Sequence, residues 1–220
     1  MILDQFKIEP IKHDNINQID ALTKLHLDLL PLSKPSKLGR IFLEKFYLST
    51  LIEHGCIKGY SFRIKDEYVG FTLFTEYPNN FIYKAFSLEP FKYILIGLYL
   101  IFTKPIIMYD TYIKGTKKIR KNHIQLNPNI KTGQWLTFAV REEYLKHISK
   151  EGLRVSQYLV NEMVNWFSNN NFSNIIAAVR KNNLPAILFY KSMGFSVEDS
   201  EFVEKGYYFL GIDLKSFLVD

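Results

Sequence analysis

Two things are scarce in this sequence, cysteine and long apolar runs. Cys56 is the one cysteine among 220 residues, so no intrachain disulfide can form, which fits a reducing compartment such as the cytoplasm. The longest apolar segment lies between Lys92 and Lys104 and has about half of the roughly 20 residues needed to span a bilayer. The N-terminus is charged and has no long apolar run, unlike a secretory signal. We expect a cytoplasmic protein without a transmembrane segment, in which residues 94–102 form a buried helix; contact with a membrane surface or with a second copy in a homodimer is the alternative.

Acidic residues are outnumbered, since 28 Lys and Arg stand against 22 Asp and Glu and give a formal net charge of +6. An excess of this size usually marks a solvated surface. The functional alternative is a polyanionic small molecule, such as a nucleotide or a coenzyme with phosphates. Nucleic acid is not expected as a partner because no zinc, helix-turn-helix or RNA-binding signature accompanies the charge. No metal site is expected either.

The N-terminal part of the chain is predicted to be helical. Apolar residues recur at helical spacing in residues 15–30, and that helix should end before Pro31. A second helix should be capped by Ser36, contain Gly39 in its first turn and stop near Gly55.

A hairpin and an insertion are expected next. The strand-like runs 57–65 and 68–75 are joined by a turn at 66–67, which is typical of paired antiparallel strands. Residues 86–132 combine the apolar helix with a basic stretch at 114–123. We interpret residues 86–132 as an insertion between the hairpin and the later strands.

The C-terminal part alternates strands and helices. Pro185 is tolerated in the first turn of one of these helices, and Gly194 stands where a left-handed C-terminal cap belongs. The order of elements predicts one α/β domain with a mixed sheet. Strands are expected at 135–140, 175–179 and 207–214, and helices at 155–168 and 183–193.

One pattern in this part is specific. Residues 183–195 read Asn-Leu-Pro-Ala-Ile-Leu-Phe-Tyr-Lys-Ser-Met-Gly-Phe. They match N-x-x-A-x-x-(F/L)-Y-x-x-x-G-F at every marked position and resemble a signature of the GNAT superfamily of N-acyltransferases. The resemblance implies a central, partly splayed mixed sheet that binds acyl-coenzyme A, with Asn183, Ala186, Phe189 and Tyr190 at the coenzyme. It also implies that the Tyr190 hydroxyl, whose ordinary pKa is about 10, protonates the departing thiolate.

The second element of that family is a (Q/R)-x-x-G-x-(G/A) loop, whose backbone N–H groups hold a pyrophosphate at the start of a helix. The corresponding segment here is Glu151-Gly152-Leu153-Arg154-Val155-Ser156, which departs from the pattern at several positions. Arg154 stands where a glycine normally lets the backbone approach a phosphate. Either the Arg154 guanidinium compensates, or Gly152 takes over the role of that glycine.

The third element is the strand at 135–140. By resemblance it splays from the strand at 175–179, and the backbone of Phe138, Ala139 and Val140 pairs with the amide groups of the pantetheine arm. A backbone N–H near Ala139 or Val140 would then polarise the thioester carbonyl.

The N-terminal half carries a further resemblance. Leu25-His26-Leu27-x-Leu29-Leu30-Pro31 and Leu38-Gly39-x-x-Phe42-Leu43-x-x-Phe46-Tyr47 resemble a GNAT subgroup of bacterial polysaccharide pathways that acylates nucleotide-linked amino sugars. A diphosphate on the acceptor would explain the basic stretch at 114–123, for which a solvated loop is the alternative. His26 would line the acceptor side, unless it is a satisfied core histidine. Residues 1–85 would then form the acceptor-side half and residues 133–220 the half that binds acyl-coenzyme A.

The resemblance implies direct transfer in a ternary complex, from acetyl-coenzyme A or another short acyl-coenzyme A to an amine. Glu76, at the end of the second hairpin strand, is the first candidate for the base and for acceptor binding; Asp110 and His123 are weaker candidates. Two alternatives stay open: an N-acyltransferase that acts on a protein or another small amine, and a GNAT-like module that binds coenzyme A without catalysis. The departures at Arg154 and Ser156 favour the last of these.

Overall fold

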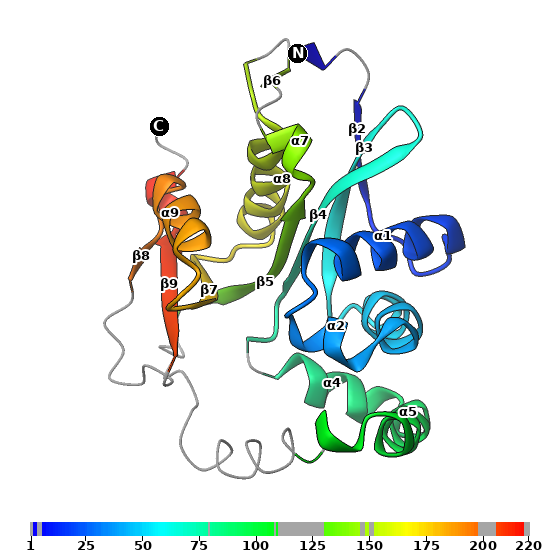
Figure 1. Ribbon diagram of the computed structural model, residues 1–220. Coiled ribbons are helices and arrows are strands. Elements are labelled where there is room, and N and C mark those ends of the chain that lie inside the picture. Colours follow the sequence, from blue (N-terminus) through cyan, green and yellow to red (C-terminus); the bar gives the residue numbers. More distant parts are fainter. Residues whose placement is uncertain are drawn as a thin grey trace.

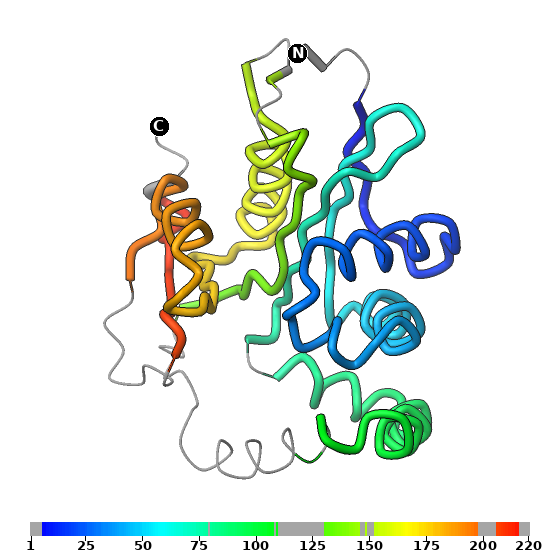
Figure 2. Tube along the Cα trace, in the orientation of Figure 1, coloured from blue at the N-terminus to red at the C-terminus, as the bar shows by residue number. Residues whose placement is uncertain are grey.

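The computed structural model describes residues 2–3, 6–78, 80–107, 109, 130–145, 148–149, 152–197 and 206–217. Its centre is a mixed sheet of seven strands in the order β2-β3-β4-β5-β7-β9-β8, and helices cover both faces (Figures 1 and 2). The predicted mixed α/β fold is therefore confirmed. The strands are β2 Phe6–Pro10, β3 Lys58–Ile64, β4 Glu67–Thr75, β5 Thr132–Val140, β7 Asn174–Arg180, β8 Ser196–Val197 and β9 Tyr207–Asp213, with a separate parallel pair of β1 Ile2–Leu3 and β6 Ile148–Ser149.

The long helices lie where the apolar periodicity predicted them, at α1, α8 and α9. Asn15 caps α1 by accepting a hydrogen bond from the Gln18 backbone N–H at 3.1 Å, as expected for an N-cap side chain. The helices are α1 Ile16–Leu29, α2 Lys34–Leu38, the π-helix η1 Phe42–Thr50, α3 Leu51–Glu53, α4 Phe81–Leu88, α5 Pro90–Thr103, α7 Glu142–Leu145, α8 Val155–Asn169, α9 Leu184–Ser192 and α10 Leu214–Phe217.

The second helix differs from its prediction. Ser33, not Ser36, caps α2, because the Ser33 hydroxyl accepts a hydrogen bond from the Ser36 backbone N–H at 3.2 Å. Gly39 does not lie inside a first turn but ends α2 with φ +98°, a conformation that side chains disfavour. The chain then enters η1, and the helical stretch stops before Gly55 as predicted. The prediction of one helix from Ser36 was thus wrong, since the backbone at Gly39 cannot continue a helix.

The hairpin is confirmed. Strands β3 and β4 pair antiparallel from Lys58↔Phe74 to Ile64↔Glu67. The chain reverses at Lys65, which has φ +53°. Strand β2, which no pattern predicted, pairs antiparallel with the other edge of β3.

The two faces of β4 pack against different helices, because successive side chains of a strand point to opposite faces. Leu73 belongs to the core formed with α1 and η1. Phe74, the next residue, contacts Phe167 of α8 with ring centroids 5.0 Å apart. Gly133 on neighbouring β5 makes room for the same ring, since a Cβ there would lie 2.0 Å from a Phe167 ring carbon. This close approach fixes α8 against the middle of the sheet.

The apolar segment at 94–102 forms a helix, α5, but the prediction that it is buried was wrong. Leu100 is buried, whereas Leu95 is 66% exposed and Phe102 is 82% exposed. Helices α4 and α5 project beyond the sheet (Figure 1), so one side of α5 packs on the core and the other faces solvent. Among the described residues no single helix is long and apolar enough to cross a membrane, although α4 and α5, bent by 115°, meet the length and composition test as a pair.

Candidate active site

The main feature of the sheet is the point where β5 and β7 separate. Their parallel pairing runs from Thr132↔Asn174 to Trp135↔Ala177 and ends there. Strand β5 continues to Val140 beside β4, and β7 continues beside β9, so the two halves of the sheet diverge beyond this point (Figure 1). The splayed pair that the resemblance implied is therefore present, and it leaves one backbone edge of β5 unpaired with β7.

A β-bulge accounts for the divergence. On β4, Leu73 and Phe74 are adjacent, but their partners on β5 are Thr137 and Trp135. Leu136 is the extra residue, and such an insertion bends a strand and increases its twist. Because the bulge directly follows the last residue paired with β7, β5 leaves that neighbour at the bulge.

Thr137 forms contacts through its carbonyl and its hydroxyl. The Trp135 indole N–H donates a hydrogen bond to the Thr137 carbonyl at 3.2 Å. The Thr137 hydroxyl lies 3.3 Å from the Tyr47 hydroxyl of η1, and burial raises the pKa of Tyr47 to about 12. These contacts rigidify the splayed strand from both faces of the sheet. No sequence pattern pointed to Tyr47 or Thr137, because their contact joins residues 90 positions apart.

An aromatic cluster surrounds the point of separation. The ring of Tyr190 on α9 lies 4.8 Å from that of Trp135 and 5.3 Å from that of Phe195, measured between centroids. The ring of Phe138, on the free part of β5, stacks on Phe189 at 4.9 Å. Three residues predicted from the motif and the strand, Phe138, Phe189 and Tyr190, are thus brought together.

The chemistry of Tyr190 follows from this environment. Its side chain is half-buried among aromatic rings, and burial raises the pKa of its hydroxyl well above the ordinary value near 10. The hydroxyl is consequently protonated at neutral pH and can donate a hydrogen bond. Such a group suits an anion that develops beside it.

The start of α8 lies at the far end of the free strand. Val140 of β5 packs with Val155, the first residue of α8, and with Leu159. Arg154 precedes the helix with extended dihedrals, and its backbone N–H donates to the Gln157 side-chain oxygen at 2.8 Å. An arginine side chain has donors only, so the Arg154 side chain cannot cap the first N–H groups of α8, at the end where the helix dipole favours an anion.

The backbone conformation at position 152 requires a glycine. It has φ +80°, and no atom lies within 4 Å of the position of a Cβ, so the glycine is required by the backbone turn and not by packing. Leu153 follows it, and Ser156 is buried in the first turn of α8. Glu151 lies outside the described residues.

The remaining motif residues shape α9. The Asn183 side chain caps the helix by accepting a hydrogen bond from the Ala186 backbone N–H at 3.2 Å. Gly194 has φ +84° just after the helix, as its predicted left-handed cap requires. The motif therefore sets both ends of α9 and with them the position of Tyr190.

Glu76 lies apart from this cluster. Its carboxylate forms an ion pair with the Lys58 ammonium, and Lys58 sits over the ring of Trp166 near the C-terminal end of α8, 4.8 Å from its centroid. The recorded partner of Glu76 is thus a lysine and not a residue near Tyr190. Asp110, His123 and the basic stretch at 114–123 lie outside the described residues.

His26 is a fully buried residue. Its Nδ1 lies 3.0 Å from the Ser36 hydroxyl, and its ring stacks on Phe71 at 5.8 Å. Burial lowers the pKa of His26 to about 4, so the imidazole is neutral at pH 7. This placement is that of a core histidine on the α1 face of the sheet.

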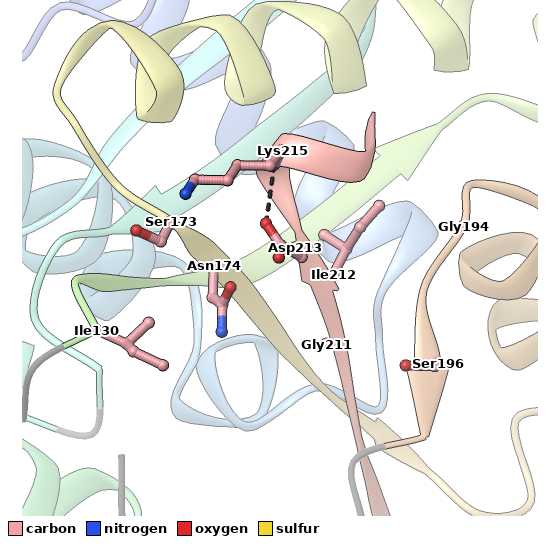
Figure 3. Close-up of a pocket in the computed structure, with 9 residues that line it drawn as sticks. All are labelled: Ile130, Ser173, Asn174, Gly194, Ser196, Gly211, Ile212, Asp213 and Lys215. Carbon is pink, nitrogen blue, oxygen red and sulfur yellow. Dashed lines mark hydrogen bonds between the residues drawn. The ribbon is translucent and has the colours of Figure 1, made fainter. Parts of the chain in front are cut away.

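A separate pocket lies at the N-terminal end of β7, where residues from β8 and β9 also line it. It has a volume of about 490 Å³, and its polar lining comes from Ser173, Asn174, Ser196, Asp213 and Lys215. Figure 3 shows these side chains around the ends of β7 and β9, with the Asp213 carboxylate accepting a hydrogen bond from the Lys215 backbone N–H at 2.8 Å. Among the described residues, no three His, Cys, Asp or Glu side chains are grouped to hold a metal ion.

Comparison with known proteins supports a class of enzyme. Residues 110–209, slightly less than half of the chain, match the acetyltransferase (GNAT) domain. This match supports an acyl-coenzyme A-dependent N-acyltransferase. No curated protein sequence matches the chain.

Solved structures agree with this class in their fold. The PaiA N-acetyltransferase of Thermoplasma acidophilum, solved with coenzyme A, is 11% identical with a TM-score of 0.53, over 95% of this chain and 99% of that one. A chimera of the Vibrio cholerae spermidine N-acetyltransferase SpeG and human SSAT is 12% identical with a TM-score of 0.55, over 99% and 100%. Arabidopsis thaliana Naa50, solved with a bisubstrate analogue, is 15% identical with a TM-score of 0.51, over 94% and 98%. At these identities the likeness shows the GNAT fold.

Proposed function

We propose that the chain transfers an acetyl or other short acyl group from acyl-coenzyme A to the amine of a nucleotide-linked amino sugar, by direct attack in a ternary complex. The observation that carries the acyl-transfer part is the free edge of β5 beyond Trp135, which begins beside Tyr190 and ends at the start of α8. An extended amide-bearing ligand can pair with such an edge as an added strand does.

The proposed coenzyme site runs along this edge. From Trp135 to Val140 the strand spans about 17 Å, at roughly 3.3 Å per residue. Pantetheine amides would pair with the backbone at Phe138, Ala139 and Val140. The pyrophosphate would lie at the N–H groups of Val155 and Ser156, where the helix dipole favours negative charge.

Arg154 has a specific role in this proposal. It is exposed and stands at the N-cap of α8, so its guanidinium can reach a phosphate without being buried. Charge-assisted hydrogen bonds from arginine to phosphate are among the stronger ones. They would compensate for the glycine that the family pattern places here, while Gly152 supplies the left-handed turn.

Proton transfers complete the mechanism. The amine attacks the thioester carbon, the C–S bond breaks, and Tyr190 donates a hydrogen bond and then its proton to the departing thiolate sulfur. The amine gives up its proton to a water chain, and Tyr190 regains a proton from the same water. Glu76 is a weaker choice for that proton because Lys58 already neutralises its carboxylate.

The acceptor is proposed from the N-terminal motif and from charge. The segments around His26 and Tyr47 resemble those of amino-sugar acyltransferases, and the basic stretch at 114–123 suits an acceptor with a diphosphate. A protein N-terminus or a polyamine is the second candidate acceptor. The observation that favours it is the fold shared with Naa50 and with a spermidine N-acetyltransferase.

A thiol-release assay tests the proposal. Acetyl-coenzyme A is combined with nucleotide-linked amino sugars, the same free amino sugars, spermidine and short peptides. The proposal expects release with the nucleotide-linked sugars and at least tenfold less with the free sugars, which lack the phosphates. Faster release with spermidine or peptides would assign the second acceptor, and binding of coenzyme A with no release for any amine would mean a non-catalytic module.

A further inference from the structure

Helix α5 presents a continuous apolar stripe to solvent. Six exposed residues share one helical face at i, i+3, i+4, i+7, i+10 and i+11 spacing. They form what we call the outer stripe: Phe91, Ile94, Leu95, Leu98, Ile101 and Phe102. Phe91 is 79% exposed.

The fold itself does not cover this stripe. The opposite face of α5 supplies the contacts with the core, through Tyr93, Ile96 and Leu100. The Tyr93 ring packs edge-on against Phe46 of η1 at 4.5 Å. Because the helix is apolar on both sides, its second side needs a partner outside the described residues, and contiguous exposed apolar surface of this kind marks an interaction site.

The charge of the sequence near α5 indicates the partner. No charged residue lies between Lys92 and Lys104. Lys92 forms ion pairs with Glu53 at 3.4 Å and with Glu89 at 3.7 Å, so its charge is offset within the fold. Residues 114–121, a short way further along the chain, hold five Lys or Arg and no acidic residue. Without these five, 23 basic residues stand against 22 acidic ones, so nearly all of the excess positive charge belongs to this part of the sequence.

We propose that the outer stripe binds the surface of an anionic phospholipid membrane, with α4 and α5 lying in the headgroup region. Apolar helices with basic residues beside them bind such surfaces through both area burial and charge. The 14 residues of α5 make a helix of about 21 Å, shorter than a hydrocarbon core of about 30 Å, and α4 bends away from it by 115°. These dimensions fit a helix pair that lies on the surface.

A second copy of the chain fits the stripe less well. In a symmetric dimer the same patch occurs on both subunits. Both subunits carry the same formal net charge of +6, so like-charge repulsion opposes the approach of two copies. An anionic surface has the complementary charge.

Vesicle cosedimentation of the full chain tests the proposal. Vesicles of phosphatidylglycerol and phosphatidylcholine are compared with vesicles of phosphatidylcholine alone. We expect about tenfold or more tighter binding to the anionic vesicles, reduced by high salt because exposed charges are screened. The triple variant Phe91→Ser/Leu95→Ser/Phe102→Ser should lose about tenfold or more of that binding, since it removes three of the exposed side chains.

Ile16→Ser is the matched control. Ile16 is 79% exposed on α1, so this change removes an equally exposed apolar side chain elsewhere and should leave vesicle binding unchanged. Circular dichroism and thiol release with a soluble amine report whether each variant is folded. Equal vesicle binding by the triple variant and the wild type overturns the proposal. So does a dimer in light scattering that the triple variant dissociates while neither protein binds vesicles, which assigns the stripe to a second copy.

Discussion

Replacement of Tyr190 by phenylalanine removes one hydroxyl and leaves the ring in place. The contacts with Trp135 at 4.8 Å and Phe195 at 5.3 Å involve the ring alone, so the aromatic cluster should persist. The Tyr190 hydroxyl forms no hydrogen bond with another described residue. Removing this hydroxyl therefore leaves no described donor or acceptor without its partner. Stability should change by less than about 1 kcal/mol.

The effect on catalysis should be much larger than the effect on stability. A hydrogen bond to a charged group is worth roughly 1.5–3 kcal/mol, and each 1.36 kcal/mol changes a rate about tenfold. If Tyr190 serves the departing thiolate, kcat should fall by about 10- to 150-fold. The KM for acetyl-coenzyme A should change little, because the charge develops only during the reaction.

The assay is thiol release at saturating amine, measured from pH 6 to about pH 9. Burial raises the pKa of Tyr190 above 10, so the hydroxyl stays protonated over this range and the ratio of wild-type to variant kcat should be constant. Tyr208→Phe on β9 is the matched control and should keep the wild-type rate. A Tyr190→Phe enzyme with unchanged kcat at every pH refutes the assignment.

Three further predictions concern stability and coenzyme binding. Gly133→Ala places a Cβ against the Phe167 ring and should lower the free energy of unfolding by about 1–3 kcal/mol. Thermal unfolding would show this as a Tm lower by roughly 2–12 °C. Gly97→Ala is the control: its Cβ meets no atom within 4 Å, so Tm should not fall. Arg154→Ala should weaken coenzyme A binding about five- to tenfold in calorimetry, and equal or tighter binding would remove the arginine from the phosphate site. The pKa of His26 is about 4 in the folded state against an ordinary 6.5. Between pH 6.5 and pH 4 the unfolded state therefore binds a proton that the folded state does not. The free energy of unfolding should fall by up to about 3 kcal/mol as the pH drops through this range. In urea unfolding at pH 7 and pH 5, His26→Gln should lose less stability than the wild type; an equal loss would show that His26 is not responsible.

Local signals accounted for much of the fold. The apolar spacing of α1 and α8, the hairpin β3–β4 and the α9 motif each involve residues close in sequence, so a periodic pattern or a turn residue was enough to predict them. Strand β2 and the π-helix η1 were missed. The pairing of β2 with β3 joins residues about 50 positions apart, and nothing local distinguishes η1 from an ordinary helix.

The candidate site was predictable in its parts but not in its assembly. The strand at 135–140 and the helix with Tyr190 were identified separately, and their contact through Trp135 depends on the bulge at Leu136, which only the register with β4 reveals. Sequence patterns also cannot tell which apolar helix a fold covers. The prediction for α5 failed for that reason, because one of its two apolar faces was enough for the core.

Crystals soaked with acetyl-coenzyme A would test the central claim most directly. The account predicts electron density for the pantetheine arm along Phe138 to Val140, the thioester sulfur within hydrogen-bond reach of the Tyr190 hydroxyl, and the pyrophosphate at the N–H groups of Val155 and Ser156. Coenzyme density elsewhere, such as in the pocket beside Asn174 and Lys215, with the edge of β5 empty, would contradict it.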